Sequence, residues 1–162
     1  MDRIIILITL LFFPYCVYAA SCLECTFDSA HLQKQYRGSK SIEVNGSVPP
    51  ERVGGTSIML LEQVVDGVLY RTERVYRNPG LRSVIHYHLF PITTCILQGT
   101  TTFVLQGNKD HEYSQGQCFV MPAYVKGCNV NRGKTPVILI DYLASSPNTP
   151  FNVSLEKPVS AM

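Results

Sequence analysis

Hydrophobic residues gather in short stretches along most of the chain, and polar turn residues separate these stretches. Stretches of this kind, rich in β-branched and aromatic residues, cover residues 58–65, 69–76, 82–88, 93–97, 101–106, 112–113, 117–121, 127–130 and 137–143. Turn signals such as Asp66-Gly67 and Asn78-Pro79-Gly80 fall between them. Short strands at roughly ten-residue spacing, with no convincing helix among them, predict an all-β sandwich or barrel.

The N-terminus departs from this pattern. An unbroken apolar run from Ile4 to Phe13 follows Arg3, and the small residues Ala19 and Ala20 come after it. The run has about ten residues, whereas a helix needs roughly twenty to span a bilayer. We expect residues 1–20 to be a secretory signal peptide, the alternatives being an N-terminal core strand or a retained anchor helix. The protein would then be secreted or periplasmic, and no other segment is long and apolar enough to span a membrane.

The rest of the chain divides by composition. Glycine, proline, serine and asparagine interrupt residues 26–57, so residues 21–57 are expected to form an irregular N-terminal arm. The run of strands predicts one β-barrel domain over residues 58–145, and residues 146–162 form a C-terminal tail.

Charged residues make up only 16% of the chain and hydrophobic residues 46%. Disordered chains have the opposite balance, so this composition indicates a folded domain. The 14 basic and 12 acidic residues form no basic cluster. A nucleic-acid partner, which needs such a cluster to neutralise phosphates, is therefore not expected.

Cysteine usage favours an oxidising compartment. One of the six cysteines, Cys16, lies in the expected signal peptide, and five remain: Cys22, Cys25, Cys95, Cys118 and Cys128. An odd number leaves one free thiol, or else Cys22 is lipidated at Ala19-Ala20-Ser21-Cys22 and anchors the protein in the cell envelope. The pairing of the other cysteines stays open, and Cys22-Leu23-Glu24-Cys25 is better explained as a structural disulfide or lipidation site than as a redox pair.

Two groups of residues resemble the two motifs of the cupin superfamily. The first motif, G-x5-H-x-H-x3,4-E-x6-G, is matched in part, and so is the second, G-x5-P-x-G-x2-H-x3-N. The matching positions are Gly80, His86, His88, Gly99, Gly116, Pro122 and Asn131. Cupins fold as small jelly-roll barrels of two packed antiparallel sheets. The resemblance therefore implies a cupin-like jelly roll over residues 58–145, in agreement with the strand pattern.

The resemblance also implies a metal site, of which half is missing. Metal-binding cupins hold one divalent metal with the two histidines and the glutamate of the first motif and the histidine of the second. His86 and His88 stand at the first two positions, but Ile92 and Gly127 stand at the others. The two histidines share a strand face, so they form a half-site for a divalent metal. The alternative is a metal-free pocket lined by both histidines.

Residues near the two histidines in sequence offer substitute metal ligands and an anion-binding group. The candidates for a third metal ligand are Cys95, Cys128 and His111, but alternation places both cysteines on the other face from the missing ligands. Arg82 shares the strand face of His86, so it is a candidate pocket residue for an anionic ligand, the alternative being a solvated charge. On the last strand, either Asp141 or its neighbour Tyr142 faces inward.

Three functions remain open. The first is a secreted or periplasmic cupin-domain protein of undefined activity that binds a small ligand in its barrel. The second is a metal-dependent cupin enzyme of the dioxygenase or isomerase type that uses His86 and His88. The third is an interaction protein anchored in the envelope through Cys22. The resemblance also implies a homodimer, for which the apolar stretch 58–61 is the candidate edge.

Overall fold

The computed structural model describes residues 41–157, which form twelve strands and no helix. Five strands make one sheet, in the order β2-β3-β11-β6-β9. All its neighbouring pairs are antiparallel. Its members are β2 (Thr56–Val65), β3 (Val68–Arg77), β6 (Ile92–Gln98), β9 (Cys118–Met121) and β11 (Val137–Ser145).

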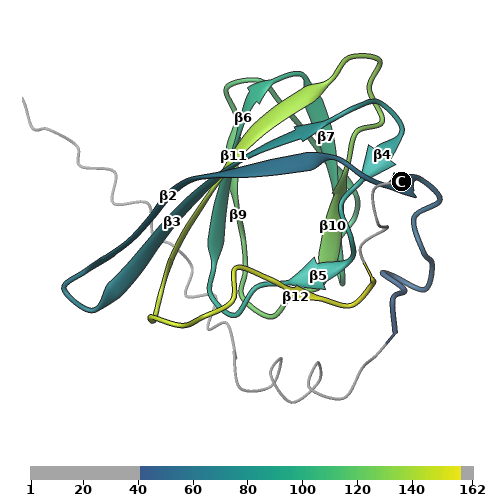
Figure 1. The fold of residues 1–162 in the computed structure, drawn as a ribbon. Coiled ribbons are helices and arrows are strands. Elements are labelled where there is room, and N and C mark those ends of the chain that lie inside the picture. The colour runs from purple at the N-terminus through teal and green to yellow at the C-terminus, as the bar shows by residue number, and fades with distance from the viewer. Residues whose placement is uncertain (1–40, 158–162) are drawn as a thin grey trace, which may run out of the picture.

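The second sheet has seven strands. β10 is its centre and pairs with β4, β5 and β7, while β1, β12 and β8 extend these pairs. Its members are β1 (Arg52–Val53), β4 (Leu81–Arg82), β5 (His86–Tyr87), β7 (Thr100–Leu105), β8 (His111–Ser114), β10 (Gly127–Val130) and β12 (Val153–Ser154). The two sheets face each other across one interior, and the β2–β3 hairpin extends beyond them (Figure 1).

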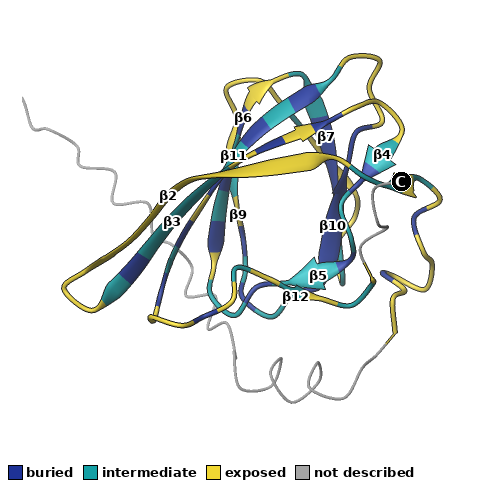
Figure 2. Ribbon diagram, in the orientation of Figure 1, coloured by how far each residue is buried: buried dark blue, intermediate teal, exposed yellow. Residues whose placement is uncertain are grey.

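Alternation along the strands determines which side chains enter this interior. On β11, Val137, Leu139, Asp141 and Leu143 are buried, whereas the residues between them are more exposed. On the opposite sheet, β10 is buried along its whole length (Figure 2), because a second apolar cluster lies behind it. In that cluster, Val44 and Leu155 pack on the outer face of the seven-stranded sheet, against Ile85 and Cys128.

The structure confirms the all-β class, and each predicted stretch contains a strand. The Asp66-Gly67 turn that joins β2 to β3 has a positive φ at both residues, as a two-residue hairpin turn of type I′ requires. The predicted strand 82–88 is wrong as one element, because it is interrupted between β4 and β5. There the Ser83 amide and hydroxyl bond the backbone of Asn129, which keeps the interrupted segment attached to β10.

Two segments outside the predicted barrel also contribute to it. Residues 41–57 were expected to be irregular, yet β1 pairs in parallel with β4 and Val44 is 1% exposed. In the tail, β12 pairs with β5. The expected signal peptide, Cys22 and Cys25 lie outside the described residues. Within 41–157, no helix exists that is long and apolar enough to cross a membrane.

A disulfide joins Cys95 and Cys118, which are directly opposite each other on β6 and β9. It lies on the outer side of the five-stranded sheet, since Ile92, Thr94 and Ile96 of β6 point inward. Cys128 is the free cysteine among the described residues, and it is buried. Burial raises the pKa of its thiol to about 12, so Cys128 is an apolar core residue rather than a reactive one.

We expect the disulfide to stabilise the fold. The disulfide closes a loop between residues 23 positions apart. For a loop of this length, replacing Cys95 and Cys118 together by serine should lower the free energy of unfolding by about 3 kcal/mol. Chemical denaturation measures this change. The control variant Cys128→Ala retains the disulfide, and peptide mapping of it under non-reducing conditions should still recover the Cys95–Cys118 crosslink. Quantitative labelling of both cysteines in the native protein would contradict the pairing.

Candidate functional site

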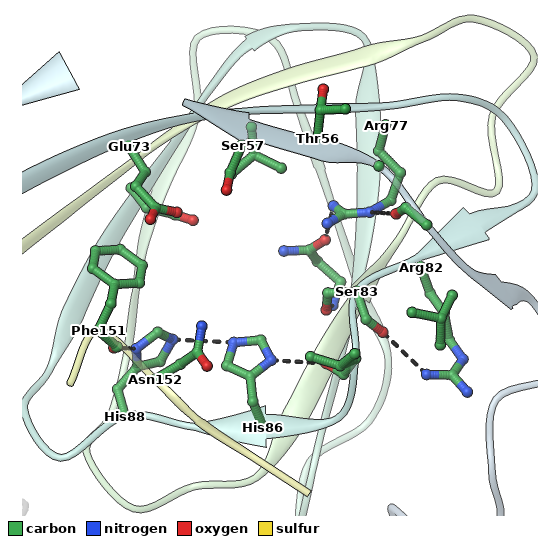
Figure 3. Close-up of a pocket in the computed structure, with 17 residues that line it drawn as sticks. Thr56, Ser57, Glu73, Arg77, Arg82, Ser83, His86, His88, Phe151 and Asn152 are labelled. Carbon is green, nitrogen blue, oxygen red and sulfur yellow. Dashed lines mark hydrogen bonds between the residues drawn. The ribbon is translucent and has the colours of Figure 1, made fainter. Parts of the chain in front are cut away.

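A cavity of about 310 Å³ lies between the two sheets. Its walls come from β2, β3, β10 and β11, from the segment around β4 and β5, and from the C-terminal tail (Figure 3). The polar lining residues are Thr56, Ser57, Glu73, Arg77, Arg82, Ser83, His86, His88, Asn129, Asp141 and Asn152. The cavity is at the small end of the size range of small-molecule sites, roughly 300 to 1,000 Å³.

His86 and His88 lie at one end of this cavity and face each other. The Nδ1 atom of His86 lies 2.8 Å from the carbonyl oxygen of Val84, and that of His88 lies 2.6 Å from the carbonyl oxygen of Phe151. A carbonyl only accepts hydrogen bonds, so both Nδ1 atoms carry the proton. The two Nε2 atoms are therefore directed toward each other, 3.1 Å apart.

Both imidazoles are held neutral. Burial, together with the neighbouring His86, lowers the pKa of His88 to about 3. Burial also lowers the pKa of His86. With both Nδ1 atoms protonated and both rings neutral, each Nε2 presents a lone pair to the other. Such an arrangement is suited to a group that interacts with both lone pairs at once, such as a metal ion or a hydrogen-bond donor that contacts both rings.

The two missing metal ligands are excluded by packing. Ile92 is 2% exposed and packs with Met121 and Leu143 in the core. At Gly127, a Cβ atom would lie 2.4 Å from the carbonyl oxygen of Val104. No side chain fits at that position without a backbone shift, so a histidine there is incompatible with this β7–β10 pairing.

None of the three substitute ligands reaches the histidines. Cys95 is in the disulfide on the outer face, and Cys128 packs against Ile85 behind the sheet. His111 is exposed on β8, where its ring contacts Tyr113. Within residues 41–157, no group of three or more histidine, cysteine, aspartate and glutamate side chains is placed to hold a metal ion.

Arg82 lines the cavity wall, but its guanidinium is occupied. It forms two hydrogen bonds with the carboxylate of Glu156, at 2.6 and 2.9 Å, and donates to the carbonyl oxygens of Pro49 and Glu51. These bonds with Glu156 raise the pKa of Arg82. In Figure 3 its guanidinium points away from the cavity. Arg82 therefore fastens the tail to the barrel, and an anion in the cavity would have to compete with Glu156 for it.

Arg77 is the cation that faces the cavity instead. It is 5% exposed, and it donates to the carbonyl oxygen of Gly54 and to the side-chain oxygen of Asn129. Burial lowers the pKa of Arg77 to about 10, so it remains charged at neutral pH. Alternation along β3 places Arg77 on the same face as the buried Val75, but alternation alone does not distinguish Arg77 from the other arginines of this hairpin.

Two carboxylates complete the lining. Asp141 is 9% exposed and its neighbour Tyr142 is 40% exposed, so Asp141 is the residue of the pair that faces inward. The Thr94 hydroxyl donates to Asp141, and burial raises the pKa of this carboxyl to about 6. Glu73 lies directly opposite Asp141 on the next strand. Its pKa is also raised by burial.

The double sheet and the position of the cavity define a cupin fold, and comparison with solved structures confirms it. A cupin domain from Bordetella pertussis Tohama I has 12% sequence identity, covers 60% of this chain and 100% of its own, and has a TM-score of 0.51. The DMSP lyase DddQ from Ruegeria pomeroyi DSS-3 has 17% identity, with coverages of 65% and 56% and a TM-score of 0.54.

A third similar structure is an oxalate oxidase in complex with the substrate analogue glycolate. It has 20% identity, with coverages of 72% and 61% and a TM-score of 0.53. No protein-family model matches the sequence, and no curated protein is similar to it. At these identities the likeness establishes the fold, while the chemistry must be argued from the site itself.

The buried carboxyl of Asp141 should make stability depend on pH. Its pKa is raised in the folded protein, so the stability it contributes is present below about pH 4 and is lost as the pH rises through about 6. We therefore expect Asp141→Asn to be more stable than the wild type at pH 7 by about 2 kcal/mol, and to lose this advantage below pH 4. Denaturation across the pH range measures the difference.

The control for this effect is Asp66→Asn, in the exposed β2–β3 turn. It makes the same substitution at an exposed aspartate, so it reports the effect of the exchange itself. A constant difference for Asp141→Asn between pH 4 and 7 would show that Asp141 ionises as freely in the folded as in the unfolded chain.

Proposed function

We propose that this protein binds a small polar molecule inside its cupin barrel. The observation that carries the proposal is the cavity of about 310 Å³, whose walls include three charged side chains, Glu73, Arg77 and Asp141, that have no direct counter-charge among the described residues. Such groups are costly to bury unless a partner satisfies them. Ile92 and Gly127, where cupin metal ligands would stand, favour a binding protein over a catalyst.

The second candidate is a metal-dependent enzyme of the cupin type. It is favoured by the opposed Nε2 atoms of His86 and His88, because 3.1 Å is close to the separation of two nitrogens bound to one ion at about 2.0–2.2 Å. A void of about 10 Å³ beside both rings has room for one water or one ion. A bound divalent ion would act there as a Lewis acid, with water or substrate as its further ligands.

Metal and ligand analysis of the purified protein separates the two candidates. For a binding protein, we expect a small molecule to be released on denaturation and transition metal to be well below one equivalent. One equivalent of metal, lost in a His86→Ala, His88→Ala variant, would overturn this proposal and support the enzyme. The matched control is His111→Ala, which removes an exposed histidine far along the chain and should leave either content unchanged.

We also propose that the protein is secreted or periplasmic. The Cys95–Cys118 disulfide supports this, because such bonds persist in oxidising compartments. An envelope anchor through a lipidated Cys22 remains the alternative, in which the barrel is a scaffold for interaction. The mass of the mature N-terminal peptide distinguishes a free chain from a lipidated one.

We propose that a second copy of the chain covers strand β2. This strand is at the edge of its sheet and all ten of its residues are exposed. Its large exposed apolar residues are Ile58, Met59, Leu60, Leu61, Val64 and Val65. A long apolar edge invites pairing with another strand. Its one charged residue, Glu62, is paired with Arg71 of the same hairpin, so no uncompensated charge on β2 repels a second copy.

Light scattering after size exclusion tests this interface. We expect a dimer for the wild type and a monomer for Leu60→Lys, because a charge at the edge of β2 opposes strand pairing. The control Val120→Lys places the same charge at an exposed apolar position on β9, the other edge of the same sheet, and should remain dimeric. A monomeric wild type at micromolar concentrations would contradict the proposal.

A further inference from the structure

The inner face of β3 carries an acidic, an apolar and a basic side chain, one after the other. Glu73, Val75 and Arg77 alternate with outward-facing residues, and all three line the cavity. Four residues of strand separate the Cα atoms of Glu73 and Arg77 by about 13 Å. In Figure 3 the two side chains enter the cavity from opposite sides, with open space between them. The cavity therefore has one cationic and one anionic end.

The cationic end has unused hydrogen-bonding capacity. Arg77 uses Nε on the carbonyl oxygen of Gly54 and one terminal nitrogen on Asn129, whereas its Nη2 donates to no protein atom of the described residues. Among the described residues, Glu51 Oε2 is the one buried side-chain polar atom that lacks a hydrogen-bond partner. The unpartnered Nη2 atom of Arg77 is therefore not sealed off, and a ligand in the cavity can reach it. No carboxylate of residues 41–157 lies within 4 Å of this guanidinium. A buried cation of this kind calls for an anionic partner.

The anionic end is unpaired in the same way. Neither Glu73 nor Asp141 has a lysine, arginine or histidine nitrogen within 4 Å among the described residues. Arg71, two residues before Glu73 on the same strand, is bonded to Glu62 and to the carbonyl oxygen of Thr149. Asp141 receives one hydrogen bond, from Thr94. Burial raises the pKa of both carboxyls. A bound cationic group would favour their ionised form.

From this arrangement we infer that the cavity takes a small zwitterion, an aminocarboxylate whose carboxylate binds Arg77 and whose ammonium group binds Glu73 and Asp141. The inference rests on the proposed ligand-binding function and specifies its ligand class. A neutral ligand would leave the buried Arg77 and Asp141 and the half-buried Glu73 without direct charged partners, and a simple carboxylate would satisfy Arg77 but meet repulsion at the other end. Val75, between the two ends, suits the methylene chain of such a ligand.

Calorimetry with a chain-length series tests the inference. The probes are β-alanine, γ-aminobutyrate, δ-aminovalerate and ε-aminocaproate, compared with valerate, pentylamine and the neutral pentanediol. We expect one chain length to bind best, and that zwitterion to bind at least about tenfold more tightly than valerate, pentylamine or pentanediol. Equal affinity for zwitterion and valerate would overturn the inference.

Variants of both ends give opposite signatures. Arg77→Gln should weaken binding of the best zwitterion at least about tenfold, and Arg77→Lys should retain part of the affinity. Glu73→Gln and Asp141→Asn should weaken the zwitterion but strengthen valerate, since they remove repulsion. The last two variants keep the side-chain shape, so the test holds even where Arg77→Gln does not fold. The controls are Arg74→Gln and Glu112→Gln, both exposed, which should bind as the wild type does.

The outcomes also separate this inference from the function beneath it. Binding of pentanediol in the barrel, or release of a non-zwitterionic molecule on denaturation, with no preference for aminocarboxylates, would leave a ligand-binding cupin and refute the ligand class. Absence of binding by every probe, together with absence of any released molecule, would refute both.

Discussion

The closed interior between two sheets is the constraint on which this structure depends. Every second residue of each strand must point into that interior, whatever its chemistry. On β3 and β11 this places Glu73, Arg77 and Asp141 in a low-dielectric space where only neutral groups, such as Thr94 and Asn129, bond them directly. Burying these charges without direct charged partners lowers the stability of the fold, and a ligand in the cavity that pairs with them would raise it.

The same packing constraint leaves the metal site of this barrel without two of its four expected ligands. Ile92 belongs to the core with Met121 and Leu143, and Gly127 lies so close to the backbone of Val104 that no side chain fits. Two positions that could hold ligands in this fold therefore serve packing. The two histidines keep their neutral state and common orientation, because Val84 and Phe151 supply the carbonyl oxygens that bond their Nδ1 atoms.

The C-terminal tail forms part of the cavity wall and orients one of the two histidines. Glu156 bonds both the guanidinium of Arg82 and the amide of Ile85. This fastens the tail beside β5, so that Phe151 reaches His88 and forms one side of the cavity. The orientation of a histidine in the middle of the chain thus depends on residues more than sixty positions later.

The sequence by itself determined most of the strands, the hairpin at Asp66-Gly67, the all-β class and the shared face of His86 and His88, because these follow from the period of two and from local turn chemistry. Tertiary structure decided what each inward residue meets. It paired Cys95 with Cys118, placed Asp141 rather than Tyr142 inside, and gave Arg82 to Glu156, leaving Arg77 to face the cavity. Alternation specifies a face of a strand, but the partner across the barrel depends on register and on contacts distant in the chain.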